Sequence, residues 1–70
     1  MPIAIAPLNK EFKIVKILVD EKTKRHLESL GVIVNAVVRV ISRSGGNIIF
    51  AVKNGRLAIN KDVANKILVG

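Results

Sequence analysis

The stretch AVVRVISRSGGNIIFAVKNGRLAI, residues 36–59, decides the fold of this chain. Aliphatic residues alternate with polar ones along it, which is typical of strands with one buried face. Turn-forming residues interrupt the alternation at Ser44–Asn47 and at Lys53–Arg56. In the second interruption, the pair Asn54-Gly55 predicts a type I′ hairpin, because that turn needs positive φ at two successive residues. The stretch therefore predicts a meander of three antiparallel strands.

The first strand of this meander, predicted over Ala36–Ser42, divides its side chains between two faces. Val38 and Val40 share one face, and Val37, Arg39 and Ile41 share the opposite one. Because successive side chains of a strand point to opposite sides, we expect one of these faces to be exposed.

Upstream of the meander, the sequence predicts a strand and then a helix. Residues 11–19 (EFKIVKILV) are strand-like, and their imperfect alternation predicts either a bulge or burial on both faces. Asp20 is the expected N-cap of a helix over Glu21–Leu30. Gly31 fits the left-handed position that follows the end of a helix.

Downstream and between these elements, short polar segments predict turns. Asn35 is the expected turn residue before the meander, since asparagine tolerates positive φ better than most residues. Asn60–Asn65 predicts a single helical or 3-10 turn capped by Asn60, and Ile67–Val69 predicts a last strand. Five short strands in a flat sheet cannot bury both faces, so we expect a mainly-β, five-stranded small barrel with one short α-helix after the first strand.

Composition supports one small β domain over residues 1–70. Ten Ile and ten Val residues favour strands, because branching at Cβ suits a pleated surface. The absence of cysteine excludes disulfides and thiolate metal sites. The uncharged segment Met1–Asn9 is too short to span a bilayer and lacks the features of a signal peptide, so we expect a cytoplasmic protein without membrane insertion.

Residues for catalysis are missing from the sequence. His26 is the one histidine, and the positive charges of Lys24 and Arg25 beside it disfavour a metal cation there. The five acidic residues show no metal-ligand spacing and no pair for acid–base work. Gly45-Gly46 lacks the Lys-Ser/Thr that a phosphate loop requires. We therefore expect no enzyme activity, no metal site and no cofactor.

The net charge of +7 raises the question of nucleic-acid binding. The twelve basic residues are spread along the chain, and no aromatic residue interleaves with them to stack on bases. Solubility explains this charge pattern better than nucleic-acid binding does, because charged side chains keep a very apolar small domain dispersed in water. We therefore expect nucleic acid not to be the partner.

Docking on another protein remains, and three surfaces are candidates for it. They are the basic part of the predicted helix, the apolar run Val32–Val34 and the exposed face of the strand over Ala36–Ser42, and the helix is the first choice. Exposed β-branched residues on edge strands would also favour self-association. The predicted docking residues are Lys22, Lys24, Arg25, Leu30, Val32 and Ile33.

The order of motifs resembles the FeoA family. The motifs are the turn Pro7-Leu8-Asn9-Lys10, the helix end Leu27-Glu28-Ser29-Leu30-Gly31 and the strand Gly55-Arg56-Leu57-Ala58-Ile59. The resemblance covers about residues 7–69, and it implies an SH3-like barrel and an accessory or regulatory role in ferrous iron transport. The implied partner is the transporter FeoB at its cytoplasmic face, and the family name associates the chain with iron homeostasis and transition metal ions.

The chain departs from the family pattern at a few positions. The family usually has glycine where Asn35 stands, and asparagine can still adopt the left-handed conformation there. An arginine usually precedes the helix leucine, whereas this chain has His26 with Arg25 one position earlier. The C-terminal domain of DtxR-like metal-dependent repressors has the same pattern. Two alternatives to docking on FeoB therefore stay open: a detached regulatory domain of such a repressor, and a small basic nucleic-acid-binding barrel.

Overall fold

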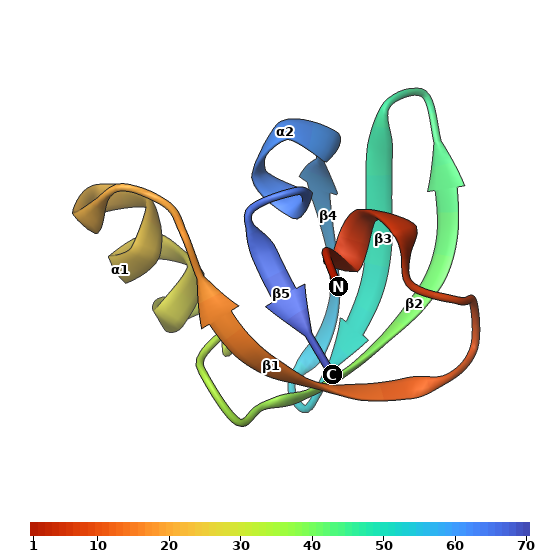
Figure 1. Cartoon of the computed structure of the whole chain (residues 1–70), viewed down its shortest axis with the longest axis horizontal. Helices are drawn as coiled ribbons and strands as arrows, with labels where there is room; N and C mark the ends of the chain where they lie inside the picture. The colour runs from red at the N-terminus through yellow and green to blue at the C-terminus, as the bar shows by residue number, and fades with distance from the viewer.

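Five antiparallel strands form one sheet in the computed structural model, which describes residues 1–70 (Figure 1). The strands are β1 (Glu11–Ile17), β2 (Val37–Ser44), β3 (Asn47–Val52), β4 (Gly55–Asn60) and β5 (Ile67–Val69). The helical elements are the 3-10 helix η1 (Ile3–Ile5), the α-helix α1 (Glu21–Ser29) and the single-turn α-helix α2 (Lys61–Ala64). No helix is long and apolar enough to cross a bilayer. The mainly-β class and the three-stranded meander are confirmed.

The sheet is open, so the predicted barrel is not confirmed. The strand order is β4-β3-β2-β1-β5, and β4 and β5 lie at its two ends without pairing. The chain passes between these ends through α2, which packs against β3, β4 and η1. The segment predicted as a helical or 3-10 turn is thus α-helical, and the Oδ1 of Asn60 caps it by accepting the backbone N–H of Val63 at 2.9 Å.

The two hairpins of the meander use different turns. Gly45 and Gly46 both have positive φ (57° and 79°), as a type I′ turn requires. In the second hairpin, β3 and β4 pair through Val52 and Gly55, so the turn residues are Lys53 and Asn54 and not the predicted Asn54-Gly55.

A like-charge clash explains the one-residue shift of the second hairpin. A turn at Asn54-Gly55 would place Lys53 directly opposite Arg56, and like charges in that position destabilise a strand pair. The observed register sets Arg56 opposite Ala51 instead. In this turn Gly55 is the one residue with a positive φ, at 144°. Asn54 therefore stays outside the left-handed region.

The core is aliphatic with one aromatic residue, Phe50. The division of β2 into two faces is confirmed: Val38 and Val40 are buried, whereas Val37 and Arg39 are exposed and Ile41 is half-buried. The largest fully buried side chains are Phe50, Ile3, Ile14, Ile67, Val32, Val38, Val40 and Val69. Burial of these residues on one side of the sheet leaves the opposite face of β1 to β4 in solvent.

The N-terminal segment belongs to the core, which the sequence analysis did not predict. Ile3 and Ala6 are fully buried. The backbone of Met1 exchanges hydrogen bonds with that of Val69 in β5. From β2, the guanidinium of Arg43 donates to the carbonyl oxygens of Ala4, at 2.6 Å, and of Ala6. A segment of six residues shows no periodicity, so only these contacts reveal its place.

The strand β1 carries the bulge that the sequence left as one of two options. Its pairing with β5 shifts between Ile14 and Lys16, so Val15 is the extra residue. The bulge lets Ile14 and Ile17 both enter the core although they are three residues apart. Burial on both faces is therefore not the reason for the imperfect alternation.

The helix α1 ends one residue before the predicted Leu30 and begins after the predicted cap, Asp20. The Asp20 side chain forms no hydrogen bond of ordinary geometry to the helix, but the neighbouring hydroxyl of Thr23 lowers the pKa of its carboxyl. Because the folded-state pKa is the lower one, this stabilisation is present above the unfolded-state pKa. It is lost as the pH falls through the folded-state value.

The contact of Arg43 with the N-terminal segment can be tested by removing the guanidinium group of Arg43. Arg43→Ala removes two charge-assisted hydrogen bonds and should lower the free energy of unfolding by about 1–2 kcal/mol. Arg39→Ala, in the same strand, removes an exposed arginine with no hydrogen bond or ion pair and should cost less than about 0.5 kcal/mol. Urea denaturation measures both values. Equal losses in the two variants would show that the N-terminal segment does not depend on Arg43.

Candidate functional site

The end of α1 fixes the direction of the chain that follows it. Gly31 adopts φ 93°, and its N–H donates to the carbonyl of Glu28 at 3.0 Å. The N–H of Val32 donates to the carbonyl of Leu27 at 2.9 Å, and the side chains of Val32 and Leu27 are both buried. This pair of bonds with its apolar contact is a Schellman motif. The predicted left-handed position of Gly31 is confirmed.

The loop that follows, residues 32–36, is also fastened at its far end. Asn35 adopts the predicted positive φ, at 76°, and its N–H donates to the carbonyl of Ile14 at 2.8 Å. The carbonyl of Ala36 accepts the N–H of Ile14 at 2.9 Å, and the N–H of Ala36 donates to Ile33 at 3.0 Å. Because both ends are bound to the body, Ile33 and Val34 remain at the tip of the loop in solvent.

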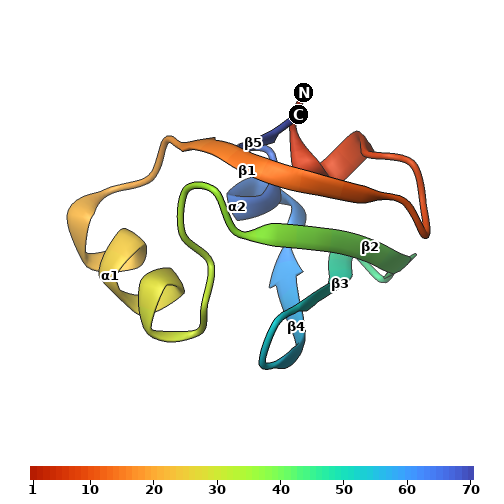
Figure 2. The same cartoon turned by 90° about the horizontal axis from the view of Figure 1, so that it is seen from below.

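An open groove of about 700 Å³ lies between this loop and the sheet. Its apolar lining comes from the loop and from the start of β2, and Ile33, Val34 and Val37 are each 46% exposed. Ala51 and Val52 of β3 line it from the sheet, and the turn residue Lys53 reaches it from the β3–β4 hairpin. We call this hollow the loop groove. Figure 2 shows the loop between α1 and the strands β1 to β4.

The predicted docking residues divide between the loop groove and other parts of the molecule. Ile33 lines the loop groove. Val32 is fully buried as part of the Schellman motif and presents no surface to a partner. Leu30 is half-buried and lines a smaller hollow of about 210 Å³ beside the start of β4.

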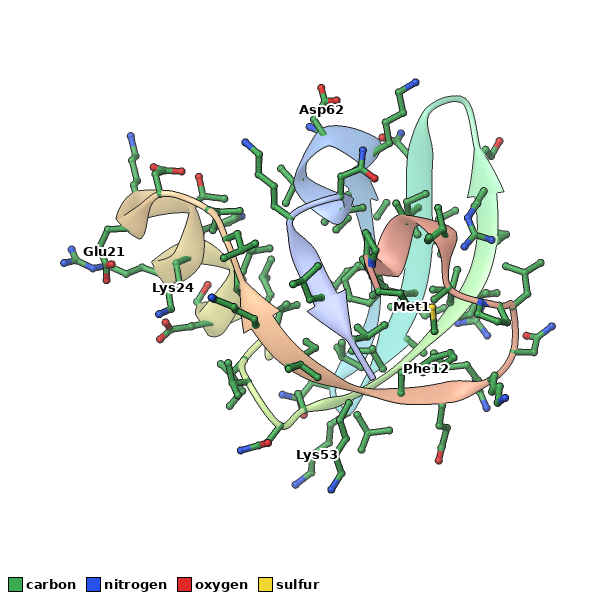
Figure 3. All side chains as sticks on the ribbon, in the orientation of Figure 1. Met1, Phe12, Glu21, Lys24, Lys53 and Asp62 are labelled. Carbon is green, nitrogen blue, oxygen red and sulfur yellow. The ribbon has the colours of Figure 1, made fainter.

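The basic residues of α1 form a separate surface. Lys22 and Arg25 are exposed and Lys24 is half-buried, and Arg25 approaches Glu21 with 3.8 Å between Nε and Oε1. In Figure 3, Lys24 lies on α1 at the left and Lys53 points away from the body at the bottom. The helix and the loop groove are therefore distinct surfaces, and Lys22, Lys24 and Arg25 line neither the loop groove nor the smaller hollow beside β4.

The structure joins two of the three surfaces that the sequence nominated. The apolar run Val32–Val34 and the exposed face of β2 meet in the loop groove, which adds Val34, Val37 and Arg39 to the candidate residues. Alternation along β2 carried the signal for Val37 and Arg39. Lys53 carries no signal in the sequence, because only the pairing of β3 with β4 brings its turn beside the loop.

Side chains that could ligate a metal ion do not cluster in this structure. No three His, Cys, Asp or Glu residues come together in a way that could hold a metal ion. His26 is exposed on α1, in the position predicted for it. The chemistry that the loop groove offers is apolar contact and charge, with Arg39 and Lys53 outnumbering the single carboxylate of Glu11.

Comparison with known proteins gives a family match. The family model described as the FeoA domain matches residues 1–70. A crystal structure of an iron uptake regulatory protein (FeoA) has a TM-score of 0.87 and 28% identity, and the match covers 99% of this chain and 93% of that one. The FeoA protein from Chlorobium tepidum has a TM-score of 0.91 at 18% identity, and the match covers 99% of this chain and 68% of that one.

A manganese-dependent transcriptional repressor has the same fold in one part of its chain. Its TM-score is 0.85 at 18% identity, and the match covers 96% of this chain but 39% of the repressor. No curated protein sequence matches the chain. The predicted resemblance is confirmed by the family model and by these structures.

The conformation of Asn35 can be tested with two substitutions. Asn35→Val places a β-branched residue at φ 76° and should lower the free energy of unfolding by about 1–2 kcal/mol. Asn35→Gly adopts the same φ without strain and should remain within about 0.5 kcal/mol of the parent. Urea denaturation measures both. A valine variant as stable as the glycine variant would contradict the left-handed conformation.

Proposed function

This chain belongs to the FeoA family, and from that premise we propose that it is a non-catalytic accessory domain of ferrous iron uptake. Its partner is a FeoB-type transporter, which it binds from the cytoplasmic side. The observation that carries the proposal is the exposure of Ile33, Val34 and Val37 at 46% each around one hollow. Adjacent aliphatic side chains that line an exposed hollow are characteristic of protein interaction sites.

The loop groove supports docking better than the basic helix does. Its loop is held at both ends by backbone hydrogen bonds, so binding does not need to order it. The helix α1 offers charges in solvent, one of them already close to Glu21, and such charges contribute little to affinity. The loop groove therefore replaces the helix as the first choice of docking surface.

The two alternatives have less support. The likeness to the manganese-dependent repressor is at 18% identity and concerns the fold alone. For nucleic acid, the basic residues are spread over both α-helices, the strands and the turns, and the two phenylalanines are buried or half-buried, so bases would find no aromatic surface.

Binding to the transporter tests the proposal directly. The labelled full chain is titrated against purified FeoB in nanodiscs and, separately, against its cytosolic GTPase domain. We expect saturable binding to the full transporter at physiological salt. Absence of binding to both preparations would refute the proposed function.

Substitutions in the loop groove test which surface docks. Ile33→Asp with Val34→Asp should weaken binding to the transporter at least about tenfold, because two apolar contacts become buried charges. Ile5→Asp with Leu8→Asp is the matched control, since those side chains are 67% and 48% exposed outside the groove and the charge change is equal. The control should bind within about twofold of the parent. Equal weakening in both variants would exclude the loop groove as the docking surface.

A further inference from the structure

A row of charged residues crosses the exposed face of the sheet beside the loop groove. Cross-strand pairing sets Glu11 of β1 opposite Arg39 of β2, Arg39 opposite Ala51 of β3, and Ala51 opposite Arg56 of β4. Directly opposite residues project on the same face with Cβ atoms about 4.5–5.5 Å apart. Glu11, Arg39 and Arg56 are all exposed. Ala51 is the smallest member of the row, so the row dips at that position between two arginines.

A second row runs beside the first and adds two lysines. Lys13 of β1 lies opposite Val37 of β2, and Lys53 follows β3 at the start of the β3–β4 turn. The face thus holds Lys13, Arg39, Lys53 and Arg56 against the single carboxylate of Glu11. The only ion pair of the molecule is on α1, so none of these four basic groups has an acidic partner within 4.0 Å.

Apolar and basic groups alternate around the loop groove as a result. Ile33, Val34 and Val37 line it together with Ala51 and the basic residues Arg39 and Lys53, and Glu11 is the one carboxylate of the lining. From this arrangement, which rests on the proposed docking function, we infer that the loop groove binds an acidic, aliphatic peptide segment of the partner. An aliphatic side chain of that segment enters the hollow over Ala51, and neighbouring carboxylates face Arg39 and Lys53.

Charge complementarity and shape select this occupant over others. Carboxylates lower the electrostatic cost of this basic face, and an arginine donates two parallel hydrogen bonds to a carboxylate. A hollow surrounds an inserted side chain on several sides, whereas a flat bilayer surface would leave the walls of the hollow in water. An extended peptide presents alternate side chains to one face, which matches an apolar hollow flanked by basic groups.

The inference can be tested with the full chain labelled with 15N and with peptides of defined composition. A blocked hexapeptide of alternating Leu and Glu should shift the amide signals of residues 33–37 and 51–54. Blocked hexapeptides of alternating Leu and Lys, and of alternating Ser and Glu, should leave them unchanged. Equal shifts with the Leu–Lys peptide would overturn the inference, as would shifts caused by phosphatidylglycerol vesicles and not by the Leu–Glu peptide.

Charge reversal locates the carboxylates of the bound peptide. Arg39→Glu with Lys53→Glu should weaken binding of the Leu–Glu peptide at least about tenfold. Lys22→Glu with Lys24→Glu on α1 makes the same change in net charge and should weaken it less than about twofold. If the strand does not tolerate glutamate, Arg39→Gln with Lys53→Gln replaces that variant. It removes the two positive charges without reversing them, so we expect a smaller loss of peptide binding. Equal losses at α1 and at the groove would reduce the effect to net charge and overturn the inference.

The two proposals can fail separately. Suppose that FeoB binding is lost in Ile33→Asp with Val34→Asp but is unaffected by Arg39→Gln with Lys53→Gln. This result would overturn the inference that the bound segment is acidic and would leave the docking function in place. Binding of the Leu–Glu peptide without binding of FeoB would refute the proposed transporter and support the peptide specificity of the groove.

Discussion

The backbone hydrogen bonds that fasten residues 31–36 are the constraint on which the rest of the structure depends. At one end Val32 is bound to Leu27 in α1, and at the other Asn35 and Ala36 are bound to Ile14 in β1. The second set of bonds brings β2 into register beside β1, so the position of the whole meander follows from it. The same bonds leave Ile33 and Val34 without a place in the core. One set of contacts therefore builds the sheet and exposes the apolar surface.

The core tolerates this exposure because it draws side chains from the whole length of the chain. Ile3 from the N-terminal segment and Ile67 and Val69 from β5 are buried together with Phe50 of the meander. A domain of this size with one buried aromatic residue needs nearly every strand to contribute to the core. Ile33 and Val34 remain outside the core because the hydrogen bonds at both ends of their loop hold its backbone away from the core.

Local rules predicted several positions from the sequence alone. The left-handed Gly31 after α1, the positive φ of Asn35 and the cap at Asn60 each follow from one residue and its neighbours, and each was predicted. The expected side-chain cap at Asp20, another local prediction, does not form. The turn after β3 was placed one residue late because repulsion between Lys53 and Arg56 operates only once the strands pair. The burial of Ile3 and the meeting of Lys53 with the loop depend on contacts distant in sequence, and no local pattern encodes them. The closed barrel is not confirmed, because the edge strands β4 and β5 do not pair and are joined only through α2.

The size of the loop groove sets the kind of association that it can support. Fully burying an aliphatic side chain is worth about 1.5–3 kcal/mol, and Ile33, Val34 and Val37 have already lost about half of their exposure to the fold. Their remaining burial contributes roughly 2–4 kcal/mol in all, which is no more than the lower estimates of the cost of association, about 4 kcal/mol. Charge pairing at Arg39 and Lys53 raises the association rate and the selectivity more than the affinity. A groove of this size is therefore suited to reversible binding. Tight association would need a second contact or a tether that raises the effective concentration of the partner to the millimolar range.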